Sequence, residues 1–219
     1  MDTVTFIEPN WPAPVNVRAY TTTRFGGVSK PPWDSLNLAI HVGDAADAVA
    51  ANRAILMQRL DLPTAPHWIN QVHGNAVADL TPHTHHECIA NGAEDASIAK
   101  KPNHVCAVLT ADCLPVLFCD KQGSRVGAAH AGWRGLVGGV LEATVKALEA
   151  NSADLLVWLG PAIGPTAFEV GDEVRTAFVR EQPEATLAFS PAGSGHWLAD
   201  LYELARQRLQ RLGIRNIYG

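Results

Sequence analysis

Apolar positions form short, nearly continuous runs in the middle of the chain and helix-spaced sets closer to its end. Three runs are short enough to be buried strands, and a turn at Lys121-Gln122-Gly123 joins the first two. They are 104–120 (HVCAVLTADCLPVLFCD), 124–132 (SRVGAAHAG) and 155–164 (LLVWLGPAIG). A further segment, 67–80 (HWINQVHGNAVADL), reads as a strand interrupted at Gly74. The pattern predicts a strand-rich middle.

Helical spacing predicts four helices. The first is 44–62, in which Asp44 is expected to be the capping residue. Its apolar residues Val49, Ile55, Leu56 and Leu60 lie at helix-like spacing. The others are expected at 135–151, 171–183 and 198–214. Because the helices are interspersed and mostly late, the order favours an α+β layered domain over a regularly alternating doubly wound fold.

Two polar regions are expected to be irregular. Residues 17–38 begin as a β-branched strand and break at Gly26-Gly27 and again at Pro31-Pro32, which predicts an ordered loop. Residues 81–103 (TPHTHHECIANGAEDASIAKKPN) are predicted to be a surface loop.

Composition narrows the class of protein. The 219 residues are 47% hydrophobic and 18% charged, as in soluble globular proteins. A net charge of −5 argues against a nucleic-acid-binding scaffold, which needs a concentrated basic face. Neither a secretory signal nor a stretch of about 20 apolar residues is present, so we expect a cytoplasmic protein with no membrane association and no obligate protein partner.

The four cysteines are expected to be reduced thiols, and none forms a C-x-x-C pair. A lone thiol in an apolar strand is most often a core side chain. Cys113 differs because the ionisable Asp112 precedes it and Pro115 marks an irregular strand position, where a side chain can reach a cleft. Cys106 and Cys119 lack such neighbours and are expected in the core.

Two histidines lie at similar positions. His73 precedes the break at Gly74, and His130 is flanked by small residues that leave room beside its ring. His73 alone is more typical of a hydrogen-bonded histidine at a strand end. Together with Cys113, however, the two histidines form a familiar zinc ligand set that leaves a fourth position open. An open zinc site is catalytic because the metal lowers the pKa of bound water to about 7.

Two other metal interpretations are weaker. The cluster 83–88 (HTHHEC) is rich in ligand types but lies in the expected loop, where adventitious binding or solvation is the better explanation. Two histidines and a cysteine also describe blue-copper centres. Multicopper oxidation needs several His-x-His pairs in addition, and this sequence has one, His83 and His85.

Candidate anion contacts follow from arginine and glycine. Residues Gly132 to Gly135 lead into a predicted helix, whose first N–H groups could bind an anion, and Arg134 lies among them. Arg24, followed by two glycines, is a second candidate for phosphate or ribose. Ordinary turn and strand-end roles explain these residues equally well.

Six ordered motifs resemble the YfiH-like family, known as polyphenol oxidase or laccase-domain proteins and associated with purine nucleoside phosphorolysis. The motifs are TTTRFGGVS, SLNLAIHVGD, NQVHG, ADCLPVLF, AAHAGWRGL and GPAIGPTAFEVGDEV. The resemblance implies one α/β/β/α layered domain over residues 1–219, related to putative cysteine hydrolases. It also implies zinc held by residues matching His73, Cys113 and His130. Family members usually continue past the IYG motif, so we expect this chain, which ends at Gly219, to lack that tail.

The resemblance implies phosphorolysis of adenosine, inosine and methylthioadenosine, and deamination of adenosine. Asp112 is the candidate acid/base group, and Arg24, Asn37, Gln71 and Arg134 are candidates for binding nucleoside and phosphate. Copper-dependent laccase activity and editing of peptidoglycan precursors have also been associated with the family. A metal-free cysteine hydrolase, with Cys113 as nucleophile and His130 or His73 as base, stays open. So does a nucleotide- or metal-binding module without activity.

Overall fold

A six-stranded mixed sheet forms the centre of the molecule. The computed structural model describes residues 4–81 and 92–219. The strand order is β13-β9-β7-β8-β5-β4, and the strands pair antiparallel except β4 with β5 and β9 with β13. The strands are β4 (Val77–Asp79), β5 (Ala96–Ala99), β7 (Leu114–Asp120), β8 (Val126–Ala131), β9 (Leu155–Leu159) and β13 (Asn216–Tyr218).

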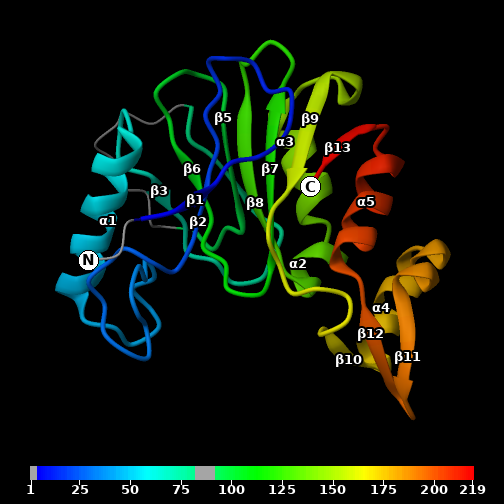
Figure 1. Ribbon diagram of the computed structural model, residues 1–219. Coiled ribbons are helices and arrows are strands. Elements are labelled where there is room, and N and C mark those ends of the chain that lie inside the picture. The colour runs from blue at the N-terminus through cyan, green and yellow to red at the C-terminus, as the bar shows by residue number, and fades with distance from the viewer. Residues whose placement is uncertain (1–3, 82–91) are drawn as a thin grey trace.

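Helices cover one face of this sheet and enclose the larger hydrophobic core (Figure 1). They are α2 (Trp133–Val137), α3 (Val140–Leu148), α4 (Asp172–Glu181) and α5 (Leu201–Arg211), with short 3-10 turns η1 (Ser152–Asp154) and η2 (Pro183–Ala188). A small antiparallel sheet extends from this side and consists of β10 (Glu169–Gly171), β11 (Phe189–Gly193) and β12 (His196–Ala199). Burial of the apolar helix faces against the sheet explains why these amphipathic segments are helical.

Short strands and a long helix lie on the opposite side of the sheet (Figure 1). The pairs are β1 (Phe6–Ile7) with β2 (Thr21–Thr22), and β3 (His67–Trp68) with β6 (Cys106–Ala107). Helix α1 (Ala46–Leu60) covers them through a second core cluster that includes Leu38, Leu56 and Leu60. The succession of helix, small sheets, large sheet and helices confirms the α+β class and its four-layered order.

The start of α1 differs from the sequence prediction. The N-cap is Ala45, and no side chain caps the helix. Asp44 instead accepts hydrogen bonds from Ser29 Oγ at 2.6 Å and Asn37 Nδ2 at 2.9 Å. Its carboxylate therefore ties the preceding loop together, since both side-chain donors come from that loop.

The predicted loop 81–103 contains a central strand. Ser97 and its neighbours in β5 are buried, and β5 lies between β4 and β8 in the sheet. The prediction was wrong here because ASIA is short, small and only moderately apolar, so its burial depends on two partners from elsewhere in the chain. The alternative metal-ligand cluster at 83–88 lies outside the described residues.

Other element boundaries also changed. The helix predicted over 135–151 is two helices, because Gly139 takes a left-handed φ of +87° and separates α2 from α3. The segment 67–80 is interrupted at His73 and Gly74, as predicted, but its two strands, β3 and β4, are shorter than expected. In the described part of the chain, no helix combines the length and apolar character that crossing a membrane requires.

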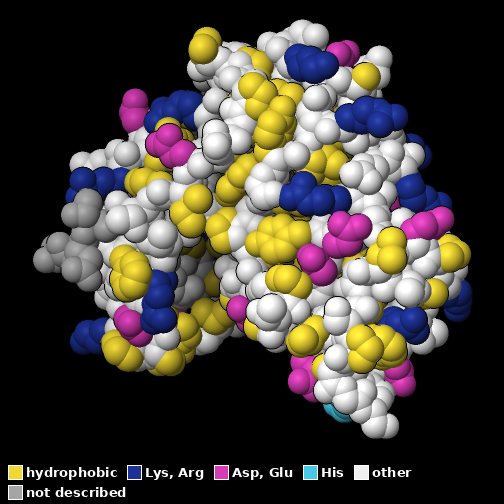
Figure 2. All heavy atoms as spheres, turned by 45° about the vertical axis from the view of Figure 1, so that its right-hand side comes forward, with side chains coloured by type: hydrophobic (Ala, Val, Ile, Leu, Met, Phe, Trp, Pro, Cys, Tyr) yellow, Lys and Arg dark blue, Asp and Glu magenta, His cyan; other side chains and the backbone are white. Residues whose placement is uncertain are grey.

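Charged side chains of both signs share the face of the molecule seen in Figure 2. Lysine and arginine alternate with aspartate and glutamate there, and no concentrated basic patch covers that view. The same view shows the surface hollowed between the lobe at its left and the centre, with hydrophobic side chains on both walls (Figure 2).

Candidate metal centre

The structure brings His73, Cys113 and His130 to one point. One ligand atom from each lies within 4.8 Å of the others. Cys113 immediately precedes β7, and His130 is on β8 in register with Pro115, so the hairpin of these two strands sets the thiol beside one imidazole. His73 enters from the bend between β3 and β4. Three separate segments therefore supply the predicted ligand set.

The three side chains differ in their exposure to solvent, and an open metal site needs one accessible side. His130 is 4% exposed, Cys113 is half-buried and His73 is exposed. The imidazole rings of His73 and His130 meet edge to face. One side of the cluster is thus enclosed by the sheet, while the side carrying His73 faces solvent.

Asp95 lies behind two of the three ligands. Its carboxylate is completely buried and accepts a hydrogen bond of 2.8 Å from His130 Nδ1. It also accepts backbone N–H bonds from Val72, His73 and Gly74 at 3.1, 2.9 and 2.6 Å. Sequence analysis missed this residue because it lies in the segment read as a surface loop. The signal that could have found it is an acid directly before the small apolar run ASIA.

Burial and hydrogen bonding set the protonation of these groups. Burial lowers the pKa of His130, more than the neighbouring Asp95 raises it. For Asp95, burial favours the neutral acid, but the bonds from His130 and the three backbone N–H groups outweigh it and lower the pKa. Burial, and then the charges of Asp112 and Asp95, raise the pKa of Cys113. A neutral imidazole is the form that binds a metal, and a bound cation would supply the charge that stabilises the Cys113 thiolate.

The backbone at Gly132 passes directly beside the ligands. A Cβ atom at this position would lie 2.8 Å from Cys113 Sγ and 3.2 Å from His73 Cδ2. Glycine therefore allows the start of α2 to approach the thiol and the exposed imidazole. The small residues around His130 led us to expect free space beside its ring. In the structure, Cys113 and His73 occupy the space next to Gly132.

The donor chemistry fits a zinc ion. Two imidazole nitrogens and one thiolate are a catalytic zinc set, in which a fourth position remains for water or substrate. Because Asp95 occupies Nδ1 of His130, Nε2 is the atom left for a metal. The same donors suit copper, so the ligand types do not by themselves choose between the two metals.

Two of the predicted site residues, Arg134 and Asp112, are close in sequence to the candidate ligands. Arg134 is exposed, stacks on the Trp133 ring at 4.3 Å, and lies two residues from Gly132. Asp112 is exposed, and its backbone carbonyl accepts a 2.9 Å bond from the Ile163 N–H. That bond fixes the loop after β9 against the segment that carries Cys113.

The other three candidates have partners within the chain. Arg24 donates to the Asp34 carbonyl at 2.8 Å and to its carboxylate at 2.9 Å, although its side chain is 61% exposed. Asn37 donates to Asp44 in the loop network described above. Both amide atoms of Gln71 bond the backbone of Leu109, at 2.8 and 2.7 Å. Gln71 thus joins the segment leading to His73 to the one leading to Cys113.

Fold and site together define a class of protein: a mixed α+β domain with two histidines and a cysteine converging at one end of its sheet. The chain belongs to the family described as multi-copper polyphenol oxidoreductase laccase, which matches residues 18–219. This confirms the YfiH-like resemblance carried by the six motifs.

Similar proteins cover almost the whole chain. It is 53% identical to purine nucleoside phosphorylase YfiH of Escherichia coli over 97% of this chain and 86% of that protein. It is 53% identical to purine nucleoside phosphorylase PA4543 of Pseudomonas aeruginosa, over 98% and 86% of the two chains. The crystal structure of Neisseria meningitidis protein NMB0706 superposes with a TM-score of 0.90 at 48% identity, over 98% and 86% of the chains. YlmD of Geobacillus stearothermophilus gives a TM-score of 0.87 at 31% identity, over 100% and 86%.

Proposed function

We propose that this protein is a zinc-dependent purine nucleoside phosphorylase. Its substrates are adenosine, inosine and methylthioadenosine, its products are the free base and the corresponding ribose 1-phosphate, and it also deaminates adenosine. The names of relatives that share about half of its residues support the phosphorylase activity. The convergence of His73, Cys113 and His130 is the observation that carries the proposal.

The proposed roles follow from the position of each group. His73, Cys113 and His130 hold the zinc ion, which supplies Lewis-acid catalysis when it is bound. Arg134, exposed next to the Gly132 approach, binds phosphate, and Arg24 is the second phosphate or ribose contact. Asn37 and Gln71 complete the nucleoside contacts in this proposal.

Phosphorolysis requires a phosphate oxygen to form a bond with the ribose anomeric carbon while the bond from that carbon to the purine nitrogen breaks. The departing purine must gain a proton, and deamination must also move protons to and from the substrate. Asp112, exposed beside Cys113, is the proposed group for these transfers. The rate also increases when phosphate is held in line with the bond that breaks, because the reacting atoms are then already oriented.

Incubation with adenosine tests the proposal directly. With phosphate, chromatography should detect adenine and ribose 1-phosphate, and inosine should appear with or without phosphate. Cys113→Ala should lose bound zinc and both activities together. Cys119→Ala is the matched control, because Cys119 is a buried thiol within β7, the strand that Cys113 precedes, and is not one of the candidate ligands. Full nucleoside turnover by Cys113→Ala would remove metal catalysis from the mechanism.

A metal-free cysteine hydrolase is the second candidate, in keeping with the implied relation to cysteine hydrolases. One observation favours it: a thiol lies near an imidazole that is itself hydrogen-bonded to a carboxylate. Cys113 would be the nucleophile, His130 the base and Asp95 the carboxylate that orients the base. Its substrate would be an amide or ester, such as a peptidoglycan precursor. Copper-dependent polyphenol oxidation is less well supported, since the three ligands account for one copper ion and not for a trinuclear cluster.

Chelation separates the two candidates. A zinc enzyme loses activity when it is stripped and regains it with added zinc. A cysteine hydrolase stays active in chelator and is then inactivated by iodoacetamide.

The described cysteines Cys106, Cys113 and Cys119 are free thiols, which is consistent with the proposed cytoplasmic location.

A further inference from the structure

We propose that Asp95 is the positioning residue of this centre and fixes both His73 and His130 in the geometry that binds the metal. The inference rests on the proposed metal centre and adds to it a residue outside the ligand set. Asp95 acts through the two histidines, and its carboxylate forms hydrogen bonds to both of the segments carrying them.

The two carboxylate oxygens of Asp95 accept hydrogen bonds from different donors. Oδ1 accepts from His130 Nδ1 at 2.8 Å and from the His73 backbone N–H at 2.9 Å. Oδ2 accepts from the backbone N–H groups of Val72 and Gly74. Four donors converge on a side chain with no solvent exposure, so the buried carboxylate is fully hydrogen-bonded.

His130 is held at both its backbone and its ring. Its backbone N–H donates to the Asp95 carbonyl at 2.7 Å, in line with the pairing of Ala96 with Ala129. The ring bond from Nδ1 to the carboxylate then fixes the rotation of the imidazole and its tautomer. With the proton on Nδ1, Nε2 keeps a lone pair for the metal.

His73 is held through the shape of its backbone. Its φ is +61°, in the left-handed region that few residues other than glycine adopt. Three successive N–H groups, those of Val72, His73 and Gly74, point to the carboxylate in this conformation. Asp95 therefore stabilises the turn that presents the His73 ring beside the other ligands.

Replacement by asparagine separates this role from simple packing. The amide has the size of the carboxylate, but one of its two ends is a donor. If the NH₂ group takes the place of Oδ1, it opposes both the His130 ring N–H and the His73 backbone N–H. Nδ1 must then become an acceptor, and the proton moves to Nε2, which can no longer bind a metal. If the NH₂ group takes the place of Oδ2, it opposes the backbone N–H groups of Val72 and Gly74 and opens the His73 turn. Each orientation of Asp95→Asn therefore disturbs at least one of the two histidines.

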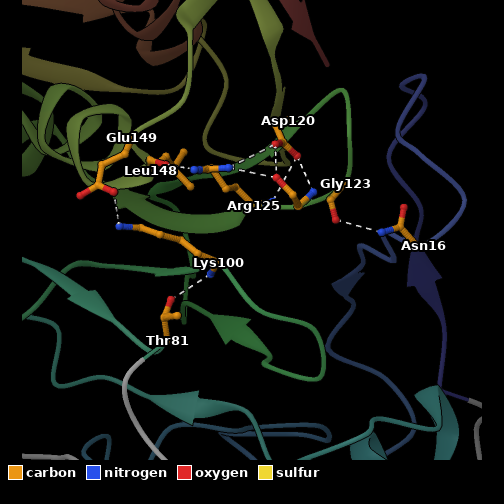
Figure 3. Close-up of polar contacts among 9 residues, drawn as sticks. Asn16, Thr81, Lys100, Asp120, Gly123, Arg125, Leu148 and Glu149 are labelled. Atoms are coloured by element: carbon orange, nitrogen blue, oxygen red, sulfur yellow. Dashed lines mark hydrogen bonds and ion pairs between the residues drawn. The ribbon is translucent and has the colours of Figure 1, made fainter.

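A matched control lies at the far end of the β7–β8 hairpin. Asp120 is 2% exposed and also clamps a turn, because it accepts from the Ser124 and Arg125 backbone N–H groups at 2.6 and 3.1 Å (Figure 3). It contacts none of the three ligands through any of these bonds. Asp120→Asn therefore reproduces the loss of a buried turn-clamping carboxylate without touching the centre.

The experiment measures metal affinity in the full chain. Cobalt(II) is titrated into metal-free parent, Asp95→Asn and Asp120→Asn, and binding is followed by the cobalt–thiolate absorption that Cys113 produces. Competition with zinc then gives relative zinc affinities, and thermal unfolding of each metal-free variant reports its stability. We expect Asp95→Asn to bind about 10- to 100-fold more weakly than the parent, and Asp120→Asn to bind like the parent.

Three outcomes would overturn the inference. Equal affinity of Asp95→Asn and parent removes Asp95 from the centre while leaving the proposed function intact. An equal loss in both variants shows that the effect is general destabilisation. If the parent shows no cobalt–thiolate absorption, the metal centre itself fails, and the positioning role fails with it.

The unaltered protein gives a second test that does not depend on whether the variant folds. Nitrogen–proton correlation spectra of the zinc-loaded chain, labelled with ¹⁵N-histidine, report the tautomer of each ring. His130 should carry its proton on Nδ1, and that proton should exchange slowly because Asp95 accepts it in a buried position. A proton on Nε2 would contradict the proposed role.

Discussion

The imidazole rings of His73 and His130 lie with their centroids 4.8 Å apart and their planes at 74°. One ring comes from a bend before β4 and the other from the end of β8. Their edge-to-face contact limits the rotation of both, so the packing of the rings and the hydrogen bonds to Asp95 define the same arrangement. Both the ring contact and the hydrogen bonds are made by the protein's own residues.

Gly132→Ala should weaken metal binding while the fold is retained. The new methyl group would meet Cys113 Sγ at 2.8 Å and the His73 ring at 3.2 Å, so both ligands would have to shift. Gly164→Ala is the control, since a Cβ there has no neighbour within 4 Å. Zinc content after dialysis, measured by mass spectrometry, should fall only in Gly132→Ala. Equal zinc content in the two variants would show that metal binding does not depend on the close approach of Gly132 to Cys113 and His73.

Removal of the metal should expose the Cys113 thiol to alkylation. Cys113 is half-buried beside an exposed histidine, whereas Cys119 is fully buried and burial raises its pKa to about 12. At mildly alkaline pH, iodoacetamide should label Cys113 in chelator-treated protein and leave it unlabelled when zinc is bound. Peptide mass spectrometry checks both sites, and Cys119 should stay unmodified until the chain unfolds. Labelling of Cys113 at the same rate with and without zinc would argue against a thiolate ligand.

Gln71→Ala should destabilise the protein, in addition to any loss of the proposed nucleoside contact. Its amide bonds both the N–H and the carbonyl of Leu109, so truncation leaves two backbone groups without these partners. We expect the free energy of unfolding of the metal-free chain to fall by about 1–3 kcal/mol in urea titrations. The opposite result, unchanged stability with a raised KM for the nucleoside, would support the substrate-binding role predicted from the sequence.

Ile98→Ala tests the central position of β5. Ile98 has no exposed surface and belongs to the main core, so the truncation should lower the free energy of unfolding by about 2–5 kcal/mol. Lys101→Ala, at an exposed position just after the strand, should change it by less than about 0.5 kcal/mol. Denaturant titrations compare the two. A small effect at Ile98 would contradict the buried strand and support the surface loop predicted from the sequence.

The sequence by itself determined much of the fold. Apolar runs placed β7, β8 and β9, and helical spacing placed α1, α4 and α5, because these elements are long enough for their own residues to show the period. The β5 segment escaped detection, since four small residues become a strand only when β4 and β8 pair on either side of them. The break between α2 and α3 depended on the backbone conformation of Gly139, which the helical period does not reveal.

The sequence also identified the three ligand candidates by residue type and by their places at strand ends and breaks. Only the tertiary structure decided that their side chains meet, because ligands from separate strands have no fixed spacing along a chain. The role of Asp95 depended entirely on tertiary structure as well. Its acceptors are filled by His130 and by the left-handed turn at His73, and both lie far from Asp95 along the chain. Local residue pattern specifies which groups are available, and the packing of distant strands specifies which of them act together.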